Sequence, residues 1–250
     1  TRLLGVNKMA TEKKNEKSYN EKEIVNYYSE FISAGLFLYE EMLIDKYFSV
    51  GGKTLDIGCG AGRVTIPLYK RGFQVVGMDY AEKMIDAASA LNENIDYRVG
   101  DILSTQFEDQ EFDNIIFSFN GLMLIGTYEE RLLAMKEIRR ILKNNGKFIF
   151  TTPYLDNKVD KSYWMEKAEA ICINVNNMTW EQQLKLGDEI LEDYGSEFFL
   201  HVPFITEVKK MVEEAGMEIL FSARRLDYSG IEKMEDELDD NYLWVIACKE

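Results

Sequence analysis

Short apolar runs alternate along the middle of the chain with segments in which apolar residues recur every three to four positions. The runs predict buried strands, and the spaced segments predict helices that pack on one side. This alternation is typical of an α/β fold with a doubly wound, mostly parallel sheet and helices on both faces. We expect strands at 53–57, 74–78, 95–99, 112–118 and 146–152, with helices at 62–71, 81–92 and 127–142.

The N-terminal part has two different patterns. Residues 1–20 are polar and without period, so we expect a disordered arm there. Residues 21–48 carry two rows of apolar positions at helical spacing. They predict one helix, or a pair broken near Gly35, that is covered on two sides.

The C-terminal part returns to the alternation of the core. A helical pattern has Thr206 as its expected N-cap and Gly216 as its expected end. Two last strands are expected at 217–223 and 242–248.

Residues 154–203 interrupt the core, which therefore divides into residues 21–153 and a C-terminal part, 204–250. This segment is rich in aromatic residues such as Trp164, and it contains the only histidine of the sequence, His201. A connection of roughly 50 residues usually has a role of its own. We interpret it as a lid over the carboxyl edge of the sheet, with a packing extension over one sheet face as the alternative.

Three glycines at alternate positions, Gly58, Gly60 and Gly62, follow the first expected strand. Residues without a side chain let the backbone turn sharply and pass close to a bound ligand. Asp56 precedes them, and Asp79 ends the next expected strand, where a carboxylate can accept both hydroxyls of a ribose. The third glycine comes one position too early for the dinucleotide-dehydrogenase fingerprint, so the spacing favours another class of nucleotide-binding protein.

The run that starts at Asp56 resembles the first motif of the class I methyltransferases that use S-adenosylmethionine. Later motifs of that family resemble residues 99–103, 112–118 and 142–150. The resemblance covers residues 53–152 and implies a seven-stranded Rossmann-like sheet of order 3-2-1-4-5-7-6. One departure is Ala81, where the family often has a serine that starts a helix. Because alanine is a poor N-cap, we expect Asp79 or Tyr80 to serve that helix end.

The resemblance also implies a binding site for S-adenosylmethionine at the carboxyl ends of the strands. Asp56 and the backbone of Gly58, Gly60 and Gly62 would surround its methionine part. Asp79, next to Tyr80, would hold the ribose.

Four further residues complete the implied cofactor site. Met84 would pack on the adenine, and Asp101 with Ile102 would hold the edge of that ring. Asn120, just after the fourth expected strand, would reach the methionine part or the acceptor. For Met84 and Asn120, ordinary packing or turn chemistry is the alternative.

The implied reaction requires neither a protein nucleophile nor a metal ion, because the cofactor supplies the reactive carbon for an in-line displacement. His201 is the candidate catalytic base for an amine or hydroxyl acceptor, since the ordinary pKa of histidine lies near neutral pH. A structural histidine is the alternative. Tyr27 and Tyr28 lie on the N-terminal helix that closes over the cofactor in many relatives, or they belong to the core.

The amino-acid composition limits which cellular compartment and which kinds of partner we expect. The chain is 46% hydrophobic and 29% charged, as in ordinary globular proteins, and no apolar run approaches the roughly 20 residues that span a bilayer. Without a signal-peptide core, a cytoplasmic location is expected. Its three cysteines, Cys59, Cys172 and Cys248, suit a reducing compartment and lack the spacing of a metal site. The net charge of −15 disfavours nucleic-acid partners.

These observations lead to one main functional prediction, which is methyl transfer from S-adenosylmethionine to a small-molecule acceptor. An RNA or protein methyltransferase is an alternative that the charge disfavours. A non-catalytic cofactor-binding protein of the same fold is another.

Overall fold

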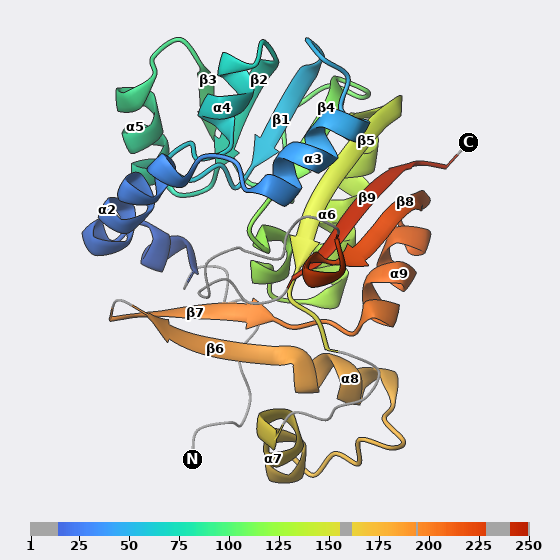
Figure 1. The fold of residues 1–250 in the computed structure, drawn as a ribbon. Coiled ribbons are helices and arrows are strands. Elements are labelled where there is room, and N and C mark those ends of the chain that lie inside the picture. Colours follow the sequence, from blue (N-terminus) through green and yellow to red (C-terminus); the bar gives the residue numbers. More distant parts are fainter. Residues whose placement is uncertain (1–14, 156–161, 194, 229–240, 250) are drawn as a thin grey trace.

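A seven-stranded sheet forms the centre of the computed structural model, which describes residues 15–155, 162–193, 195–228 and 241–249 (Figure 1). The strand order is β3-β2-β1-β4-β5-β9-β8, and only β9 runs antiparallel to its neighbours within this sheet. The strands are β1 (Lys53–Ile57), β2 (Gln74–Asp79), β3 (Asp96–Val99), β4 (Phe112–Phe117), β5 (Leu142–Thr152), β8 (Met217–Arg224) and β9 (Tyr242–Cys248). The expected α/β class and strand order are confirmed, with β8 and β9 as the sixth and seventh strands of the sheet.

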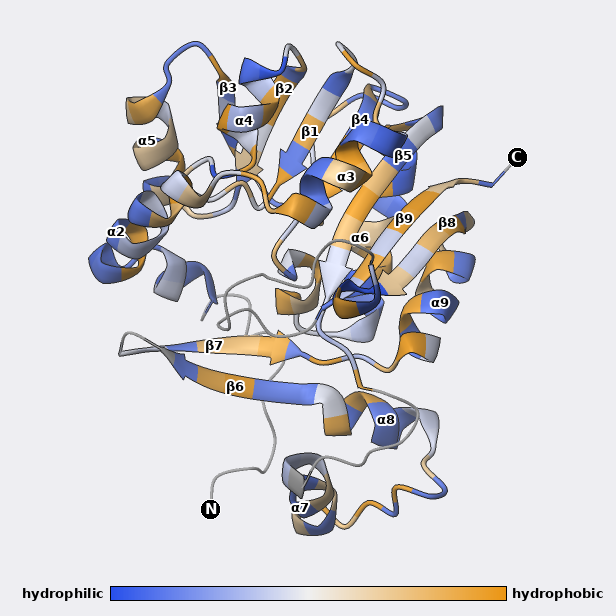
Figure 2. Cartoon of the chain, viewed as in Figure 1, coloured by the Kyte–Doolittle hydropathy of each residue, from blue (hydrophilic) through white to orange (hydrophobic). Residues whose placement is uncertain are grey.

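Helices cover both faces because neighbouring residues of a strand point to opposite sides. In β4, Ile115 packs in a cluster with α6 (Tyr128–Ile141) and α9 (Ile205–Glu214). The next residue, Ile116, packs in a second cluster with α3 (Leu38–Tyr47) and α4 (Thr65–Lys70). The central strands are therefore apolar on both sides, and Figure 2 shows hydrophobic residues along the middle of β5.

The N-terminal helical pattern breaks near Gly35, as expected. The chain forms α2 (Lys22–Phe31) and the short 3-10 helix η1 (Ile32–Ala34) before α3 begins. Gly35 has a φ of +63°, in the left-handed region that favours glycine. Gly35 therefore ends the first helical segment, α2 with η1, and α3 follows it as the second helix of the expected pair.

The start of α9 differs from the expected N-cap, Thr206. The helix begins at Ile205 with Phe204 as N-cap, so Thr206 lies in its first turn. Buried Phe204 forms an isolated parallel bridge with Leu155, and extended backbone therefore continues to residue 204. Tertiary packing, not the capping preference of threonine, sets this boundary.

The insertion folds into two helices followed by an antiparallel hairpin that the sequence pattern does not predict. These elements are α7 (Ser162–Ala170), α8 (Trp180–Gly187), β6 (Asp188–Asp193) and β7 (Ser196–His201). Figure 1 shows β7 beyond the ends toward which the parallel strands point, and β7 contacts the 3-10 helix η2 (Gly121–Leu124). Figure 2 shows that β7 is largely hydrophobic.

Residues 15–19 are helical and contact β7. The side chains of Asn15 and Ser18 are buried there and form hydrogen bonds with the backbone of β7. This order differs from the disordered arm expected for residues 1–20, because the polar side chains are used in tertiary contacts instead of being solvated. Residues 1–14 of that arm lie outside the described residues.

Candidate functional site

Two adjoining cavities lie at the carboxyl ends of β1, β2 and β4. Both are lined by Gly58, Asp79, Tyr80, Gly121 and Leu124. The larger, of about 460 Å³, extends past β3 and is also lined by Asn15, Glu16, Ile57, Met78, Val99, Gly100, Asp101, Ile102, Leu103, Phe117 and Ile125. The smaller, of about 90 Å³, extends toward α2 and is also lined by Tyr19, Tyr28, Phe31, Asp56, Cys59, Gly60, Ala61, Arg63, Val64, Met84, Ser118 and Phe119.

The loop after β1 requires glycine at two positions beside these cavities. Gly58 and Gly60 have φ values of +61° and +51°, which residues with a side chain rarely adopt. A Cβ on Gly58 would also lie 2.9 Å from Cε2 of Phe117. A Cβ on Gly60 would meet open space, so its backbone is accessible from the smaller cavity. The loop therefore leaves room for a ligand to approach the main chain.

Asp79 joins this loop to the next helix, α5 (Glu82–Leu91). Its Oδ2 accepts a hydrogen bond from the Gly60 N–H and its Oδ1 from the Ala81 N–H, both at 2.9 Å. This second bond ends at the N-cap residue itself, whereas the Lys83 N–H in the first turn of α5 donates to Asn20 Oδ1 at 3.0 Å. Asn20 therefore supplies the cap that Ala81 lacks, instead of the expected Asp79 or Tyr80. Burial raises the pKa of Asp79 to about 6, against the opposing effect of these backbone donors. A carboxylate with a fixed orientation thus lies where the two cavities meet.

Asp56 is a second buried carboxyl group beside the smaller cavity. It lies in β1, and its Oδ2 accepts a hydrogen bond of 2.6 Å from the Thr65 hydroxyl at the start of α4. Burial raises its pKa to about 7. Near neutral pH this group therefore exists in both protonation states.

Four further candidates also reach a cavity. Tyr80 lines both, and Met84 lines the smaller one. Asp101 and Ile102 line the larger one, where exposed Asp101 accepts a hydrogen bond of 2.9 Å from the Leu103 N–H. The structure thus brings the candidates from three successive strand ends together, because parallel strands end at one edge of the sheet.

Two of the candidates for the cofactor site, Gly62 and Asn120, line neither cavity. A Cβ on Gly62 would lie 2.8 Å from the Tyr97 hydroxyl, so this glycine serves packing beneath the loop. Asn120 directs its side-chain amide to Asn241 Oδ1 at 3.3 Å, and its N–H donates to the Thr151 hydroxyl at 3.0 Å. The turn after β4 therefore engages Asn120 with Thr151 and Asn241, which favours the turn-chemistry alternative over contact with the cofactor or acceptor.

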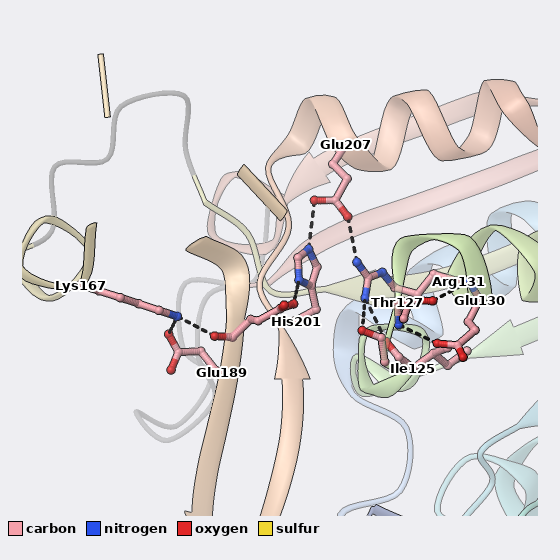
Figure 3. A network of polar contacts seen from close by, with 10 residues as sticks. Ile125, Thr127, Glu130, Arg131, Lys167, Glu189, His201 and Glu207 are labelled. Atoms are coloured by element: carbon pink, nitrogen blue, oxygen red, sulfur yellow. Dashed lines mark hydrogen bonds and ion pairs between the residues drawn. The ribbon is translucent and has the colours of Figure 1, made fainter. Parts of the chain in front are cut away.

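His201 lies in a buried polar network outside the cavity linings (Figure 3). Its Nδ1 contacts Asp188 Oδ1 at 2.8 Å and its Nε2 contacts Glu207 Oε2 at 3.0 Å. Glu207 also accepts a hydrogen bond of 3.3 Å from Arg131. Nδ1 thus bonds within the hairpin, to β6, and Nε2 links the hairpin to α9, whose Glu207 in turn pairs with Arg131 of α6. This placement favours the structural alternative over the expected catalytic base, because both ring nitrogens are occupied by carboxylates.

A buried ion pair beside the smaller cavity was not predicted from the sequence. Arg63 donates to the two carboxylate oxygens of Glu40 at 2.7 and 2.8 Å, and the Ser118 hydroxyl also donates to Glu40. The guanidinium carbon lies 4.3 Å from the Phe37 ring centroid. The available signals were an arginine directly after the glycines and an acidic residue within an apolar helical segment. The pair joins α3 to the glycine loop.

Other lining residues come from segments without a recognisable motif. Asn15 and Tyr19 lie in the polar N-terminal region, where the sequence showed no periodicity. Gly121 follows β4, and a Cβ there would lie 2.0 Å from Cε2 of Phe117, so only glycine fits. The Asn-Gly pair at the end of the expected fourth strand was the one signal that pointed to this turn.

Part of the chain is similar in sequence to known methyltransferases. Residues 55–150 match the methyltransferase domain family. A demethylmenaquinone methyltransferase of Staphylococcus haemolyticus (strain JCSC1435) is 33% identical over 116 residues, which are 44% of this chain and 47% of that protein. The chain thus spans about half the length of the curated relatives it matches.

Solved structures extend the similarity to most of the fold. An S-adenosylmethionine-dependent methyltransferase from Methanosarcina mazei has a TM-score of 0.68 at 18% identity, covering 86% of this chain and 99% of that one. The 1,6-didemethyltoxoflavin-N1-methyltransferase of Burkholderia thailandensis, solved with 1,6-didemethyltoxoflavin and S-adenosylhomocysteine, has a TM-score of 0.56 at 12% identity. The aligned region covers 84% of this chain and 76% of the Burkholderia chain. At these identities the likeness is one of fold.

Proposed function

We propose that this chain belongs to the class I S-adenosylmethionine-dependent methyltransferases and transfers the methyl group of that cofactor to a small-molecule acceptor. The observation that carries the proposal is Asp79, whose carboxylate is held by the Gly60 and Ala81 N–H groups at the junction of two cavities. A ribose with two adjacent hydroxyls suits this acceptor group.

The two cavities suit the two ends of the cofactor. In the larger, Asp101 and Ile102 would contact the adenine edge, and Tyr80 would flank the ring. In the smaller, Asp56 and the backbone of Gly60 would face the methionine part. The residues present therefore fit S-adenosylmethionine.

The protein's part in the reaction is to position the reactants and exclude water. S-adenosylmethionine supplies an electrophilic methyl carbon on a sulfonium. Gly58 and Gly60 allow close approach of the backbone, and Asp79 fixes the ribose. Tyr28 and Phe31 on α2 line the smaller cavity and would reduce the access of water to the bound cofactor. Alignment of donor and acceptor in a dry site is a sufficient contribution for such a displacement.

The acceptor is expected to be small and without a strong negative charge. The smaller cavity is lined by Tyr19, Tyr28, Phe31 and Phe119. Arg63, the one cation among the described lining residues, is already paired with Glu40. The relatives named above act on demethylmenaquinone or bind 1,6-didemethyltoxoflavin, which are small molecules. The net charge of −15 disfavours a nucleic-acid acceptor. Among the described residues, no helix combines the length and apolar character needed to cross a membrane.

Calorimetric titration with S-adenosylhomocysteine tests the proposal. Binding at a micromolar dissociation constant is expected, and a labelled-methyl assay against metabolite pools should identify a methylated small molecule. Tight binding of NAD without measurable binding of S-adenosylhomocysteine would contradict the proposed cofactor. Binding without transfer to any pool would favour the non-catalytic alternative.

A further inference from the structure

One buried side chain, Asn15, connects three segments that are far apart in the sequence. Its Nδ2 donates to the Leu124 carbonyl at 3.1 Å and to the Phe199 carbonyl at 3.0 Å. Its Oδ1 accepts from the Phe199 N–H at 2.7 Å. Leu124 is 109 residues away in the chain and Phe199 is 184 residues away. The side chain is 1% exposed.

An amide is the side chain that these three contacts require. It offers two N–H donors and one carbonyl acceptor, and all three are used here. The pair of bonds to Phe199 resembles the pairing of a neighbouring strand, because one residue of β7 both donates and accepts. The remaining donor is directed to η2. A carboxylate in the same place would keep the bond from the Phe199 N–H and lose both donated bonds.

The segment that Asn15 holds at η2 forms a wall of the proposed cofactor site. Leu124 lines both cavities, and Ile125 after it lines the larger one. Asn15 and Glu16 line the larger cavity as well. On the other side, the Arg131 guanidinium donates to the Ile125 carbonyl at 2.9 Å. The carbonyls of two adjacent wall residues are thus fixed by separate buried side chains.

Ser18 provides an internal comparison. Its hydroxyl donates to the Glu197 carbonyl at 2.9 Å, so it also ties the N-terminal segment to β7. The side chain is 7% exposed, and Ser18 lines neither cavity. Its bond reaches β7 alone, whereas Asn15 joins β7 to the cavity wall.

We propose that Asn15 is a positioning residue for the cofactor. By holding the Leu124 carbonyl against β7, it fixes the η2 wall at the position that the adenosine part of S-adenosylmethionine requires. This inference rests on the proposed function, since it assumes that the larger cavity takes that part of the cofactor. It assigns the insertion a role in cofactor binding through β7, although the cavity linings described above contain no residue of 154–203.

The test compares Asn15→Ala, Asn15→Asp and Ser18→Ala in the full chain. Calorimetry gives the affinity for S-adenosylhomocysteine, and hydrogen exchange gives the protection of amides 121–125. Both Asn15 variants should bind S-adenosylhomocysteine roughly tenfold more weakly, because the bond to the wall is lost in each. Their amides 121–125 should exchange faster. Ser18→Ala should keep the affinity within about twofold and leave these amides protected.

Two results would overturn the proposal. Equal loss of affinity in Asn15→Ala and Ser18→Ala would mean that any anchor to β7 has the same effect. Wild-type affinity in Asn15→Asp would mean that the bond to Leu124 does not position the wall. Asn15→Asp decides the matter if Asn15→Ala does not fold, because it keeps the size of the side chain and one of its bonds.

Failure of the proposed function would be recognised separately. If the wild-type protein does not bind S-adenosylhomocysteine, the cofactor assignment falls. The exchange measurement then still decides whether Asn15 holds the η2 wall in place. Faster exchange at 121–125 in the Asn15 variants than in Ser18→Ala supports it, and unchanged exchange rejects it.

Discussion

The proposed cofactor site has a floor and a cover that are built in different ways. The floor consists of residues 56–61, 79–80 and 101–102, and the cover consists of the lining residues between 15 and 31. The cover is anchored to β7, which itself lines neither cavity. In the floor, the bonds of Asp79 reach residues 19 and 2 positions away. In the segment that carries the cover, Asn15 and Ser18 bond to β7 across 184 and 179 positions. Short-range contacts leave a motif in the sequence, whereas such distant contacts leave none.

The largest expected effect lies at the link between α3 and the floor, the Glu40–Arg63 pair. Its side chains are 1% and 10% exposed, so Glu40→Ala leaves a buried guanidinium without its counter-charge. Removing one partner of such a pair costs about 3–5 kcal/mol of unfolding free energy. Urea unfolding measures it. Asp45→Ala is the matched control on the same helix, because its ion pair with Arg71 is exposed.

The control should lose no more than about 1 kcal/mol, as exposed ion pairs contribute little. A similar loss in the two variants would show that the link depends on apolar packing and not on the buried charges.

The floor should be most sensitive at Asp79. Asp79→Ala removes a carboxylate proposed to accept the ribose hydroxyls, and it should weaken S-adenosylhomocysteine binding by about 1.5–3 kcal/mol. Asp101→Ala, at an exposed carboxylate of the same floor, should cost less because solvent competes for its hydrogen bonds. Calorimetry of both variants measures the difference. Equal losses would argue against Asp79 as the principal anchor.

The affinity for S-adenosylhomocysteine should depend on pH through Asp79, a residue of the floor. Burial raises the pKa of Asp79 to about 6, so its ionised fraction grows as the pH rises from 5 to 7. If the carboxylate binds the ribose, the affinity for S-adenosylhomocysteine should rise about tenfold across this range. Asp79→Asn should remove the step centred near pH 6. A step that persists in this variant would assign it to another group.

Stability should change in the opposite direction over nearly the same range. The raised pKa values of Asp79 and Asp56, about 6 and about 7, mean that the folded protein binds more protons than the unfolded chain. The unfolding free energy of the ligand-free protein should therefore be greatest near pH 4 with respect to these two groups and fall as the pH rises to 7. Urea unfolding at several pH values, with Asp56→Asn as a comparison, checks the sign.

The smallest expected effect on ligand binding is at His201. His201→Gln disturbs the network between Asp188 and Glu207, so unfolding free energy should fall by about 1–3 kcal/mol. The affinity for S-adenosylhomocysteine should stay within a few-fold, because the imidazole lies outside both cavity linings. Loss of methyl transfer in a folded, cofactor-binding variant would restore the catalytic assignment.

Particular residues show what could be predicted from the sequence. The observed β1 has the expected bounds, and Gly58, Gly60 and Asp79 lie at the cavities because strand, turn and acid are encoded within about 25 residues. Asn120 had the same kind of local signal, but its turn engages it with Thr151 and Asn241 outside both cavity linings. Asn15 had no signal at all, since its role depends on β7. Sequence patterns report local conformation, and these two placements depend on tertiary contacts.

The distance of 184 residues between Asn15 and Phe199 also has a consequence for how the protein is made. During synthesis the N-terminal segment leaves the ribosome well before β7. At about 5–20 residues per second, the wait is roughly 10–40 s. During that time the aromatic residues of the segment, among them Tyr19 and Tyr28, lack the strand that covers them. The nascent chain therefore exposes these aromatic side chains until β7 has left the ribosome, and the site is completed only then.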